Sequence, residues 1–387
     1  MLRVAIIGNG NISYAHVRGY LDLGDRCKIT HLVDIVPSKS EAQKQMFDLD
    51  CQVHDDHRAI LDADDVDLVS VCTPPYVHAE IAINFLKAGK HVICEKPMAP
   101  SLAECDAMIA AASESGKILS PVAQNRFLEP IMNLKRTLDS GLIGKLVHAQ
   151  IDSHWWRGHP YYDLWWRGTW QTEGGGCTLN HAVHHIDMLG WMMGRPDAVS
   201  AMLANTNHDN SEVEDLSVAV MRYPGGALAQ VTSSVVHHGE HQQVIFQGEH
   251  ARVSAPWSID ASVTAPNGFP IPNEELKNKL QTQYDGFEKL KFFGHTGQIE
   301  NVVSAIENGI ENGSRPLVTP ADGRLTIELI TAIYKAGTEH REIRLPLTAD
   351  DPFYTVDGIM KSVPHFYEKT ASVQAQEGEI TIGGKYW

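Results

Sequence analysis

The chain has 387 residues, of which 43% are hydrophobic and 21% charged, and its formal net charge is −16. This composition is ordinary for a globular protein, and the length exceeds what one hydrophobic core usually serves, so we expect two domains. The acidic balance argues against nucleic acids and anionic membrane surfaces as partners, because binding to either depends on positive charge.

The cysteines and the hydrophobic runs indicate where the protein acts. The six cysteines show no CxxC or other metal-type spacing, so we interpret them as free thiols in a reducing compartment. The apolar run at the N-terminus is too short for a signal peptide, and no stretch reaches the roughly 18 apolar residues of a membrane span. We therefore expect a cytoplasmic protein.

The first motif is a strand, a glycine turn and a helix. A buried strand is predicted over residues 2–7, followed by Gly8-Asn9-Gly10-Asn11-Ile12-Ser13 and a helix over 13–23. Gly8 permits the tight turn, Gly10 lets the backbone approach a pyrophosphate, and the helix N-terminus offers free N–H groups. Ser13 stands where the dinucleotide fingerprint usually has a third glycine or alanine. The pattern predicts a dinucleotide site.

The next strand, over residues 28–33, ends on Asp34. An acidic residue at this distance from the glycines usually binds the adenosine ribose hydroxyls and would repel a 2′-phosphate, which favours NAD over NADP. Its alternative role as a helix cap is better filled by Pro37 and Ser38.

Strands and helices then alternate along the chain, as in a doubly wound parallel sheet. Residues 1–123 are therefore predicted to form a dinucleotide-binding domain. Its further strands are expected at 52–54, 68–72, 91–94 and 118–122, and its helices at 38–48, 56–61, 77–88 and 101–115, with another helix following at 128–140.

The strand 91–94 ends on Glu95-Lys96-Pro97. In an open α/β sheet, ligands bind at the carboxyl ends of the strands. A residue before proline is kept out of the helical region, so Lys96 has a defined direction. The alternative is a surface turn with a solvated salt bridge.

From residue 145 the rhythm changes to alternating apolar and polar positions, typical of an antiparallel sheet. This second domain is predicted over 124–387, with the helices near 295–336 packing back on the first domain. Residues 257–293 are expected to be irregular with short helical patches, and the tail (370–387) to be peripheral or an oligomer arm. Strands are expected at 147–153, 197–205, 215–223, 226–236, 242–247, 251–256 and 341–347, and helices at 294–309 and 320–336.

Residues 154–173 form a loop dense in aromatic side chains. Aromatic faces stack on the C–H surfaces of sugars, and arginines bind hydroxyls or carboxylates. The alternatives are a subunit interface, where the same residue types are enriched, and a local hydrophobic cluster. The residues are Trp155, Trp156, Tyr161, Tyr162, Trp165, Trp166 and Trp170, with Arg157 and Arg167 between them.

A glycine run leads into a helix predicted over residues 178–193. Asn180 and His184 would share one face, and His181 with His185 would form a second pair. The latter spacing could suit zinc, but the glutamate of an HExxH motif and a nearby cysteine ligand are absent, so we predict no metal. His185 is best explained as a core residue.

Four motifs in order resemble the Gfo/Idh/MocA family of glucose–fructose oxidoreductase and inositol dehydrogenase-like enzymes. The resemblance implies an α/β fold, with a Rossmann domain followed by a domain built on a large, mainly antiparallel open sheet. It also implies oxidation or reduction of sugars and cyclitols with NAD or NADP. The motifs are Gly8-Asn9-Gly10, Thr73-Pro74-Pro75-Tyr76-Val77-His78, Ala88-Gly89-Lys90-His91-Val92-Ile93-Cys94-Glu95-Lys96-Pro97, and Gly174-Gly175-Gly176 with His184 and Asp187.

The resemblance also implies residue roles. Lys96 would stabilise the alkoxide and help to move its proton, and His184 would be the acid–base group. Asn180 stands where the family usually has aspartate and can only orient substrate or imidazole, because an amide does not exchange a proton at neutral pH. The cofactor would contact Gly8, Gly10, Asn11, Ile12, Asp34, Thr73, Pro74, His78, Glu95, Lys96, Gln124, Trp166 and Arg167, and the substrate Lys96, Arg126, Trp156, Arg157, Trp165, Asn180, His181 and His184.

These expectations describe an NAD-dependent oxidoreductase acting on a secondary alcohol or ketone of a sugar, cyclitol or sugar derivative. Two alternatives stay open: an NAD-dependent glycosidase that works by transient oxidation and elimination, and a non-catalytic NAD-binding regulatory relative. Retention of both Lys96 and His184 speaks against the latter. We also expect a homodimer or homotetramer formed through the open sheet.

Overall fold

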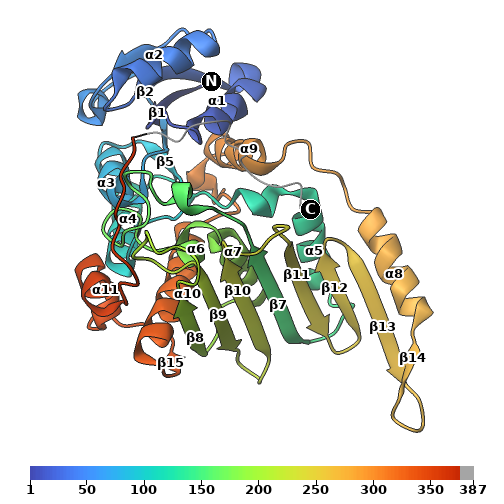
Figure 1. Cartoon of the computed structure of the whole chain (residues 1–387). Helices are drawn as coiled ribbons and strands as arrows, with labels where there is room; N and C mark the ends of the chain where they lie inside the picture. The colour runs from blue at the N-terminus through green and yellow to red at the C-terminus, as the bar shows by residue number, and fades with distance from the viewer. Residues whose placement is uncertain (375–387) are drawn as a thin grey trace. The chain divides into compact units, whose positions relative to one another are not determined.

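The computed structural model describes residues 1–374 and divides into two compact units (Figure 1). The first unit contains Met1–Phe127 and Lys291–Ile327, and the second contains Leu128–Leu290 and the chain from Glu328 onward. The first unit is therefore assembled from two separate stretches of sequence. Of the tail predicted to be peripheral or an oligomer arm, the part from residue 375 lies outside the described residues.

The first unit is built on a six-stranded sheet within the described chain, and all of its strands are parallel. The strand order is β3-β2-β1-β4-β5-β6, so the order reverses between β1 and β4, where dinucleotides bind in folds of this type. The predicted doubly wound sheet is confirmed. Its strands are β1 (Leu2–Ile7), β2 (Cys27–Val33), β3 (Gln52–His54), β4 (Leu68–Val71), β5 (His91–Cys94) and β6 (Leu119–Pro121).

The helices of this unit follow local sequence signals. Pro37 occupies the first turn of its helix, where a missing N–H costs nothing. Ser101 accepts a hydrogen bond from the Glu104 amide at the start of the next long helix, and Gly116 ends that helix in the left-handed conformation. The helices are α1 (Ser13–Asp22), α2 (Pro37–Met46), α3 (His78–Lys87), α4 (Leu102–Ser115) and α9 (Gly294–Glu307).

Helix α9 completes the core of the first unit although it comes late in the chain. It packs on α1 so closely that a Cβ at Gly19 would lie 2.6 Å from Ile299 Cδ1. Ile299 and Val302 join the buried cluster that also contains residues of β1 and β2. Gln298 donates to the Pro121 carbonyl oxygen at 2.7 Å, so α9 is also hydrogen-bonded to the end of β6.

The second unit contains a nine-stranded mixed sheet among the described residues, in the order β14-β13-β12-β11-β7-β10-β9-β8-β15. Every pairing is antiparallel except that of β7 with β10. The predicted mainly antiparallel sheet is confirmed. Its strands are β7 (Leu146–His154), β8 (Ala198–Ala204), β9 (Leu216–Arg222), β10 (Leu228–Ser234), β11 (Gln242–Gly248), β12 (Ala251–Ala255), β13 (Ser258–Thr264), β14 (Pro270–Pro272) and β15 (Ile343–Arg344).

Helices cover one face of this sheet and leave the other open. Along β9, Ala219 and Met221 are buried whereas Val218 and Val220 are exposed, the alternation expected of a half-covered sheet. The helices are α5 (Glu129–Asp139), α6 (Cys177–Asn180), α7 (Val183–Met193), α8 (Glu274–Asp285) and α11 (Val356–Ser362), together with the second part of α10 (Pro320–Glu339). No helix within residues 1–374 combines the length and the apolar character needed to cross a membrane.

Two local predictions were wrong. Residues 257–293 are not irregular, because they contain β13, β14 and α8. The apolar signal there is weak: α8 has only Leu276 and Leu280 in its apolar positions, and most side chains of β13 are exposed. The helix predicted over 178–193 is broken into α6 and α7 around His181, so Asn180 and His184 do not belong to one continuous helix.

Candidate functional site

The glycine turn after β1 is closely packed at Gly8 and open at Gly10. Gly8 has a φ of 89° and donates its N–H to the Val33 carbonyl oxygen at 2.7 Å. A Cβ at Gly8 would lie 2.8 Å from the Cys72 carbonyl oxygen, so only glycine fits. A Cβ at Gly10 would meet nothing within 4 Å. The backbone at Gly10 therefore borders the open space that a bound phosphate requires.

Asp34 holds this turn in place. Its carboxylate accepts hydrogen bonds from the backbone N–H groups of Asn9 at 2.7 Å and Val36 at 2.8 Å. Each carboxylate oxygen has a second lone pair, so Asp34 still has acceptor capacity for hydroxyl groups. The structure thus gives Asp34 a structural role that the sequence did not predict, beside the predicted contact with ribose.

Several polar groups of the first unit fit a bound dinucleotide. Helix α1 has no side-chain cap. The Ser13 and Ala15 N–H groups donate to the carbonyl oxygens of Gly10 and Ile12, so a ligand would use the other N–H groups of the glycine turn and the first turn of the helix. Thr73 Oγ1 and Gln124 Oε1, both predicted to contact the cofactor, are buried and have no hydrogen-bond partner among the described residues. Buried polar atoms rarely lack a hydrogen-bond partner, so these two atoms are consistent with a bound ligand such as NAD that supplies one.

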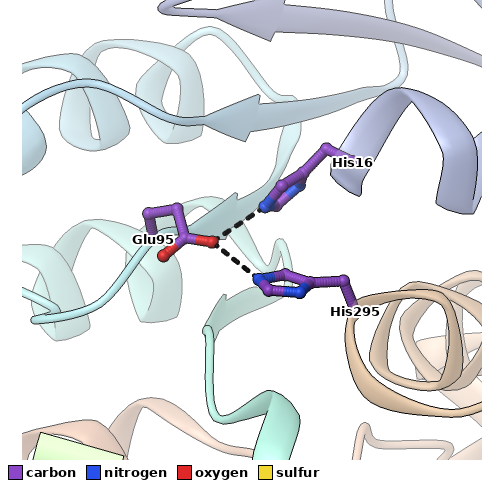
Figure 2. A group of neighbouring side chains, drawn as sticks. All are labelled: His16, Glu95 and His295. Carbon is purple, nitrogen blue, oxygen red and sulfur yellow. Dashed lines mark hydrogen bonds and ion pairs between the residues drawn. The ribbon is translucent and has the colours of Figure 1, made fainter. Parts of the chain in front are cut away.

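The carboxylate of Glu95, at the carboxyl end of β5, is the centre of a buried cluster of hydrogen bonds (Figure 2). Its Oε1 accepts from His16 Nε2 at 3.0 Å and from His295 Nε2 at 3.1 Å, and its Oε2 accepts from the Lys96 N–H at 3.0 Å. Burial acts to raise the pKa of Glu95, but the hydrogen bonds from the two histidines outweigh it, and the pKa lies well below its ordinary value. Glu95 also fixes the backbone of Lys96, and its contact with the nicotinamide stays a prediction.

A chain of hydrogen bonds orients His16 in this cluster. Burial lowers the pKa of His16, so its imidazole is neutral at pH 7 and carries one N–H. Because the Glu95 carboxylate can only accept, that proton lies on Nε2. His16 Nδ1 then accepts from Ser70 Oγ at 3.0 Å, and Ser70 accepts from the Tyr20 hydroxyl at 2.7 Å.

The side chains of His16, Glu95 and His295 are of the types that can bind a metal ion. The ligand atoms of His16, Glu95 and His295 lie within 4.8 Å of one another. However, the two imidazole nitrogens already donate to the carboxylate at hydrogen-bond distance, and a cation would have to replace both bonds. We therefore interpret the group as a hydrogen-bonded cluster.

His78 links the loops that follow β4 and β5. It is fully buried, with Nδ1 2.9 Å from the Pro97 carbonyl oxygen and Nε2 2.8 Å from the Thr73 carbonyl oxygen. Burial lowers the pKa of His78, and a neutral imidazole has one N–H, so the ring donates to one of these two carbonyl oxygens and lies against the other. The geometry favours support of these loops over the predicted contact of this side chain with the cofactor.

Arg126, predicted to contact substrate, is also a core residue of the first unit. Its side chain is 1% exposed, and Nη1 donates to Asp322 Oδ1 at 3.2 Å. A buried ion pair of this kind supports the fold, so the structure gives no support for a direct contact between Arg126 and substrate.

In the second unit, the glycine run before α6 is enforced by close packing. A Cβ at Gly175 would lie 2.2 Å from the Tyr334 hydroxyl, and a Cβ at Gly176 would lie 1.9 Å from the Glu214 carbonyl oxygen. The buried Glu214 carboxylate accepts from the N–H groups of Gly176 and Thr178, both at 3.0 Å, and so caps α6. Burial raises the pKa of Glu214 to about 7.

This packing sets the orientation of Asn180. Its amide nitrogen donates to the Gly175 carbonyl oxygen at 2.8 Å. The atom that faces the Gly175 carbonyl oxygen must be the amide nitrogen and not the amide oxygen, because a carbonyl oxygen can only accept. The Asn180 amide oxygen is then the atom that can accept from a further group such as a hydroxyl.

The histidines of α6 and α7 have different surroundings. His184 is partly exposed, whereas every other residue of Val183–Gly190 is buried. His185 is fully buried, and burial lowers its pKa to about 3. His181 Nε2 lies 3.2 Å from the Tyr161 hydroxyl, and its ring centroid lies 5.8 Å from that of Trp155. The aromatic loop therefore borders the segment that carries Asn180 and His184.

The aromatic loop, residues 154–173, is only partly available to a ligand. Tyr162 and Trp170 are each 1% exposed and belong to the core, whereas Trp156 is 43% exposed. Trp165 and Trp166 are partly exposed. The predicted ligand contacts at Trp156, Trp165 and Trp166 thus lie on side chains that solvent reaches.

Residues 364–373, which we call the C-terminal strap, are hydrogen-bonded to the aromatic loop, a contact that we did not predict from the sequence. The Trp165 N–H donates to the Val373 carbonyl oxygen at 2.9 Å, and the Val373 N–H donates to the Asp163 carbonyl oxygen at 2.8 Å. Trp170 Nε1 donates to the Pro364 carbonyl oxygen at 3.1 Å. Long-range contacts of this kind leave no local pattern in the sequence.

Comparison with known proteins gives matches along most of the chain. Residues 2–122 match a family model described as an oxidoreductase family with an NAD-binding Rossmann fold, and residues 131–254 match a GFO/IDH/MocA C-terminal domain.

Three individual proteins illustrate the range of relatives. The chain is 26% identical over 349 residues to myo-inositol 2-dehydrogenase of Thermotoga maritima, covering 89% of this chain and 98% of the relative. It is 25% identical over 367 residues to 2,7-anhydro-N-acetylneuraminate hydratase of Mediterraneibacter gnavus, covering 88% and 96%. The WlbA dehydrogenase of Bordetella pertussis, solved in complex with NADH and UDP-GlcNAcA, superposes with a TM-score of 0.76 at 25% identity, covering 90% and 99%.

Proposed function

Since the chain belongs to the Gfo/Idh/MocA oxidoreductase family, we propose that it transfers a hydride between NAD and a secondary alcohol or ketone of a sugar, a cyclitol or a sugar derivative. The observation that carries the proposal is the placement of Lys96. Its backbone N–H is bound to the buried Glu95 carboxylate at the carboxyl end of β5, the edge of a parallel sheet where dinucleotides bind.

NAD supplies the hydride acceptor or donor, and the first unit supplies its binding groups. The N–H groups at the start of α1 would hold the pyrophosphate, with Gly10 allowing its close approach. Asp34 would bind the adenosine ribose with its remaining lone pairs and repel a 2′-phosphate. Thr73 and Gln124 would satisfy their buried oxygens against the cofactor.

Each residue that we assign to chemistry has a distinct task. The Lys96 ammonium would hydrogen-bond the reacting oxygen and stabilise its negative charge. His184, the partly exposed residue near the start of α7, would take the hydroxyl proton during oxidation and return it during reduction. Asn180 would accept from a neighbouring hydroxyl through its amide oxygen, because its nitrogen is held by Gly175. His181 is assigned as a further substrate contact.

The direct test is NADH formation with a panel of polyols, sugars and sugar acids, with NADP measured in parallel. We expect net NADH from at least one class and a higher kcat/KM with NAD than with NADP. Equal or better use of NADP would refute the role of Asp34, and no turnover with any panel member would refute the proposed oxidoreductase activity on these classes.

The similarity to a hydratase favours one second candidate, in which the chain oxidises its substrate only transiently. Elimination or addition of a hydroxyl would then occur without net change in the cofactor. Product formation from a glycoside or an anhydro sugar, with catalytic NAD and no accumulated NADH, would support this candidate.

We also propose that the protein self-associates through the open face of its second sheet. Met202, Val218 and Val220 are exposed on adjacent strands β8 and β9, an apolar surface of the kind that subunit contacts cover. The molar mass in solution, measured by light scattering, tests this proposal.

A further inference from the structure

The two arginines of the aromatic loop are already paired with carboxylates of the protein. This matters because free arginines at a substrate site would favour acidic sugars, whereas paired ones do not. The loop contacts the functional segment directly, since the Tyr161 hydroxyl lies 3.2 Å from His181 Nε2. The charge state of the loop therefore bears on which substrates the second unit accepts.

Arg167 is held by a carboxylate that is itself fixed. Its Nη1 donates to Glu173 Oε1 at 2.7 Å, and the other oxygen of Glu173 accepts from the Gly168 N–H at 2.6 Å. Glu173 is 1% exposed, and its two oxygens both accept from N–H groups, so it cannot turn away without losing a bond. The guanidinium carbon also lies 4.1 Å from the ring centroids of both Tyr161 and Trp166, which fixes it from the sides.

Arg157 is neutralised in the same way by a residue outside the loop. Its Nη1 donates to Glu240 Oε1 at 2.5 Å and to the Trp156 carbonyl oxygen at 2.6 Å. The Trp156 N–H donates to the same oxygen of Glu240 at 3.2 Å. The carboxylate thus binds both the side chain and the backbone of the loop at this point.

The third cation at the loop is Lys369 of the C-terminal strap. Its ammonium donates to the carbonyl oxygens of Tyr162 and Leu164, so it is bound to the loop backbone. Two further carboxylates lie here: Asp163 belongs to the loop and accepts from Asn210 Nδ2, and Glu212 accepts from the Trp170 N–H. At least four carboxylates, those of Glu173, Glu240, Asp163 and Glu212, therefore accompany the cations Arg157, Arg167 and Lys369 among the described residues.

We propose that the aromatic loop selects uncharged polyhydroxy substrates, sugars or cyclitols without a carboxylate or phosphate, because Nη1 of each of its arginines already donates to a protein carboxylate, Glu173 or Glu240, which offsets the arginine's charge. This inference rests on the proposed hydride transfer and names the substrate class for that reaction. An anionic ligand must displace a protein carboxylate or lie beside it, and like charges so placed repel. The partly exposed rings offer apolar faces, and Asn180 offers an uncharged acceptor for a hydroxyl.

The test compares pairs that share a ring and differ by one anionic group: glucose with glucuronate, galactose with galacturonate, and myo-inositol with an inositol monophosphate. Binding to the NADH-loaded protein is measured by calorimetry, and kcat/KM is measured with NAD where turnover occurs. We expect the neutral member of the preferred pair to be favoured by about tenfold or more. Glu240→Gln should reduce this preference several-fold, because it leaves the Arg157 charge without its carboxylate.

The control is Glu342→Gln, which removes the carboxylate partner of Arg222 at an exposed position of the same unit. It should leave the neutral-to-acid ratio unchanged. Glu240 is itself partly exposed, and the melting temperature of Glu240→Gln shows whether the variant folds.

Equal or better binding of the acidic members by the unaltered protein overturns the inference, and so does a ratio that Glu240→Gln does not change in a folded variant. Failure of the proposed function looks different: no NADH forms from any pair, yet calorimetry still reports which member binds. Absence of binding by both members of every pair also overturns the inference.

Discussion

His295 donates a hydrogen bond to Glu95 at 3.1 Å although 200 residues of sequence separate them. The same carboxylate oxygen accepts from His16 of α1, so one anion ties α1, α9 and the end of β5 together. Lys96 follows directly and uses the other oxygen. The position of the proposed catalytic lysine therefore depends on side chains from three separate parts of the sequence.

Removing the imidazole of His295 should destabilise the first unit. His295→Ala takes one donor from a buried carboxylate, and we expect the free energy of unfolding to fall by about 1–3 kcal/mol. His295→Gln, whose amide can still donate, should recover part of the loss. Chemical denaturation checks both variants, and unchanged stability of His295→Ala would contradict the role of this bond.

The buried histidines make stability fall as the pH is lowered. Burial lowers the pKa of His185 to about 3, whereas the unfolded chain has a value near 6.5. Below pH 6.5 the unfolded state binds the proton first, so His185 costs about 1.4 kcal/mol per pH unit as the pH falls from there toward 3. His185→Leu should weaken this dependence by that amount in denaturation curves measured between pH 7 and pH 5.

The exposed His250 provides the control for this experiment. His250→Gln should leave the pH dependence as it is.

Glu95 also makes the protein less stable in acid, but at lower pH. Its folded pKa is depressed, so its contribution to stability is present above about pH 4.5 and is lost as the pH falls through the folded value.

Lys96→Met should abolish most turnover while NADH still binds. The substitution keeps the length of the side chain but removes the charge that stabilises the alkoxide, a loss of about 10²- to 10⁴-fold in kcat. Steady-state kinetics and NADH fluorescence titration measure the two effects separately. Lys87→Met, at an exposed position of α3, is the matched control, and near-normal turnover of Lys96→Met would refute the assignment.

Restoring the acidic residue common in the family should harm this protein. In Asn180→Asp, a carboxylate oxygen would replace the amide nitrogen that donates to the Gly175 carbonyl oxygen, and two acceptors would face each other. We expect a loss of about 1–3 kcal/mol in stability together with lower turnover. A variant with the original melting temperature and higher kcat would show that the segment before α6 adapts to aspartate.

Two glycines of the same turn should respond differently to alanine. Gly8→Ala introduces a Cβ 2.8 Å from the Cys72 carbonyl oxygen at a φ of 89°, so the melting temperature should fall. Gly10→Ala meets no protein atom within 4 Å and should fold normally. Its NADH Kd should nevertheless rise by about tenfold or more, because the methyl group occupies the space next to the phosphates. Unchanged NADH affinity of Gly10→Ala would place the pyrophosphate elsewhere.

Local patterns were sufficient to predict the parallel sheet from the sequence. Most of its strands are short apolar runs with a turn or helix signal behind them, and β5 with Glu95-Lys96-Pro97 is an example. The same reasoning failed for β13 and α8, where few apolar side chains are buried and periodicity is weak.

The candidate site could be predicted only in part. Sequence motifs indicate which residues carry chemistry, but not which partners they already have. Glu95 was expected to line the cofactor because of the family resemblance, and nothing in the sequence connects it with His16 or His295. Likewise, Arg157 and Arg167 were interpreted as ligand contacts because arginines bind hydroxyls and carboxylates, and their partners Glu240 and Glu173 are visible only in the fold.

The division of the first unit between two stretches of sequence has a consequence for synthesis. A ribosome that has delivered residues 1–290 has released every strand of the parallel sheet, yet α9 has not emerged. Until it does, the surface of α1 that receives Ile299 stays exposed, and the Glu95 anion lacks one of its donors. The nascent dinucleotide unit thus displays an apolar surface while residues 128–290 of the second unit are made, which is the interval in which chaperones would bind it.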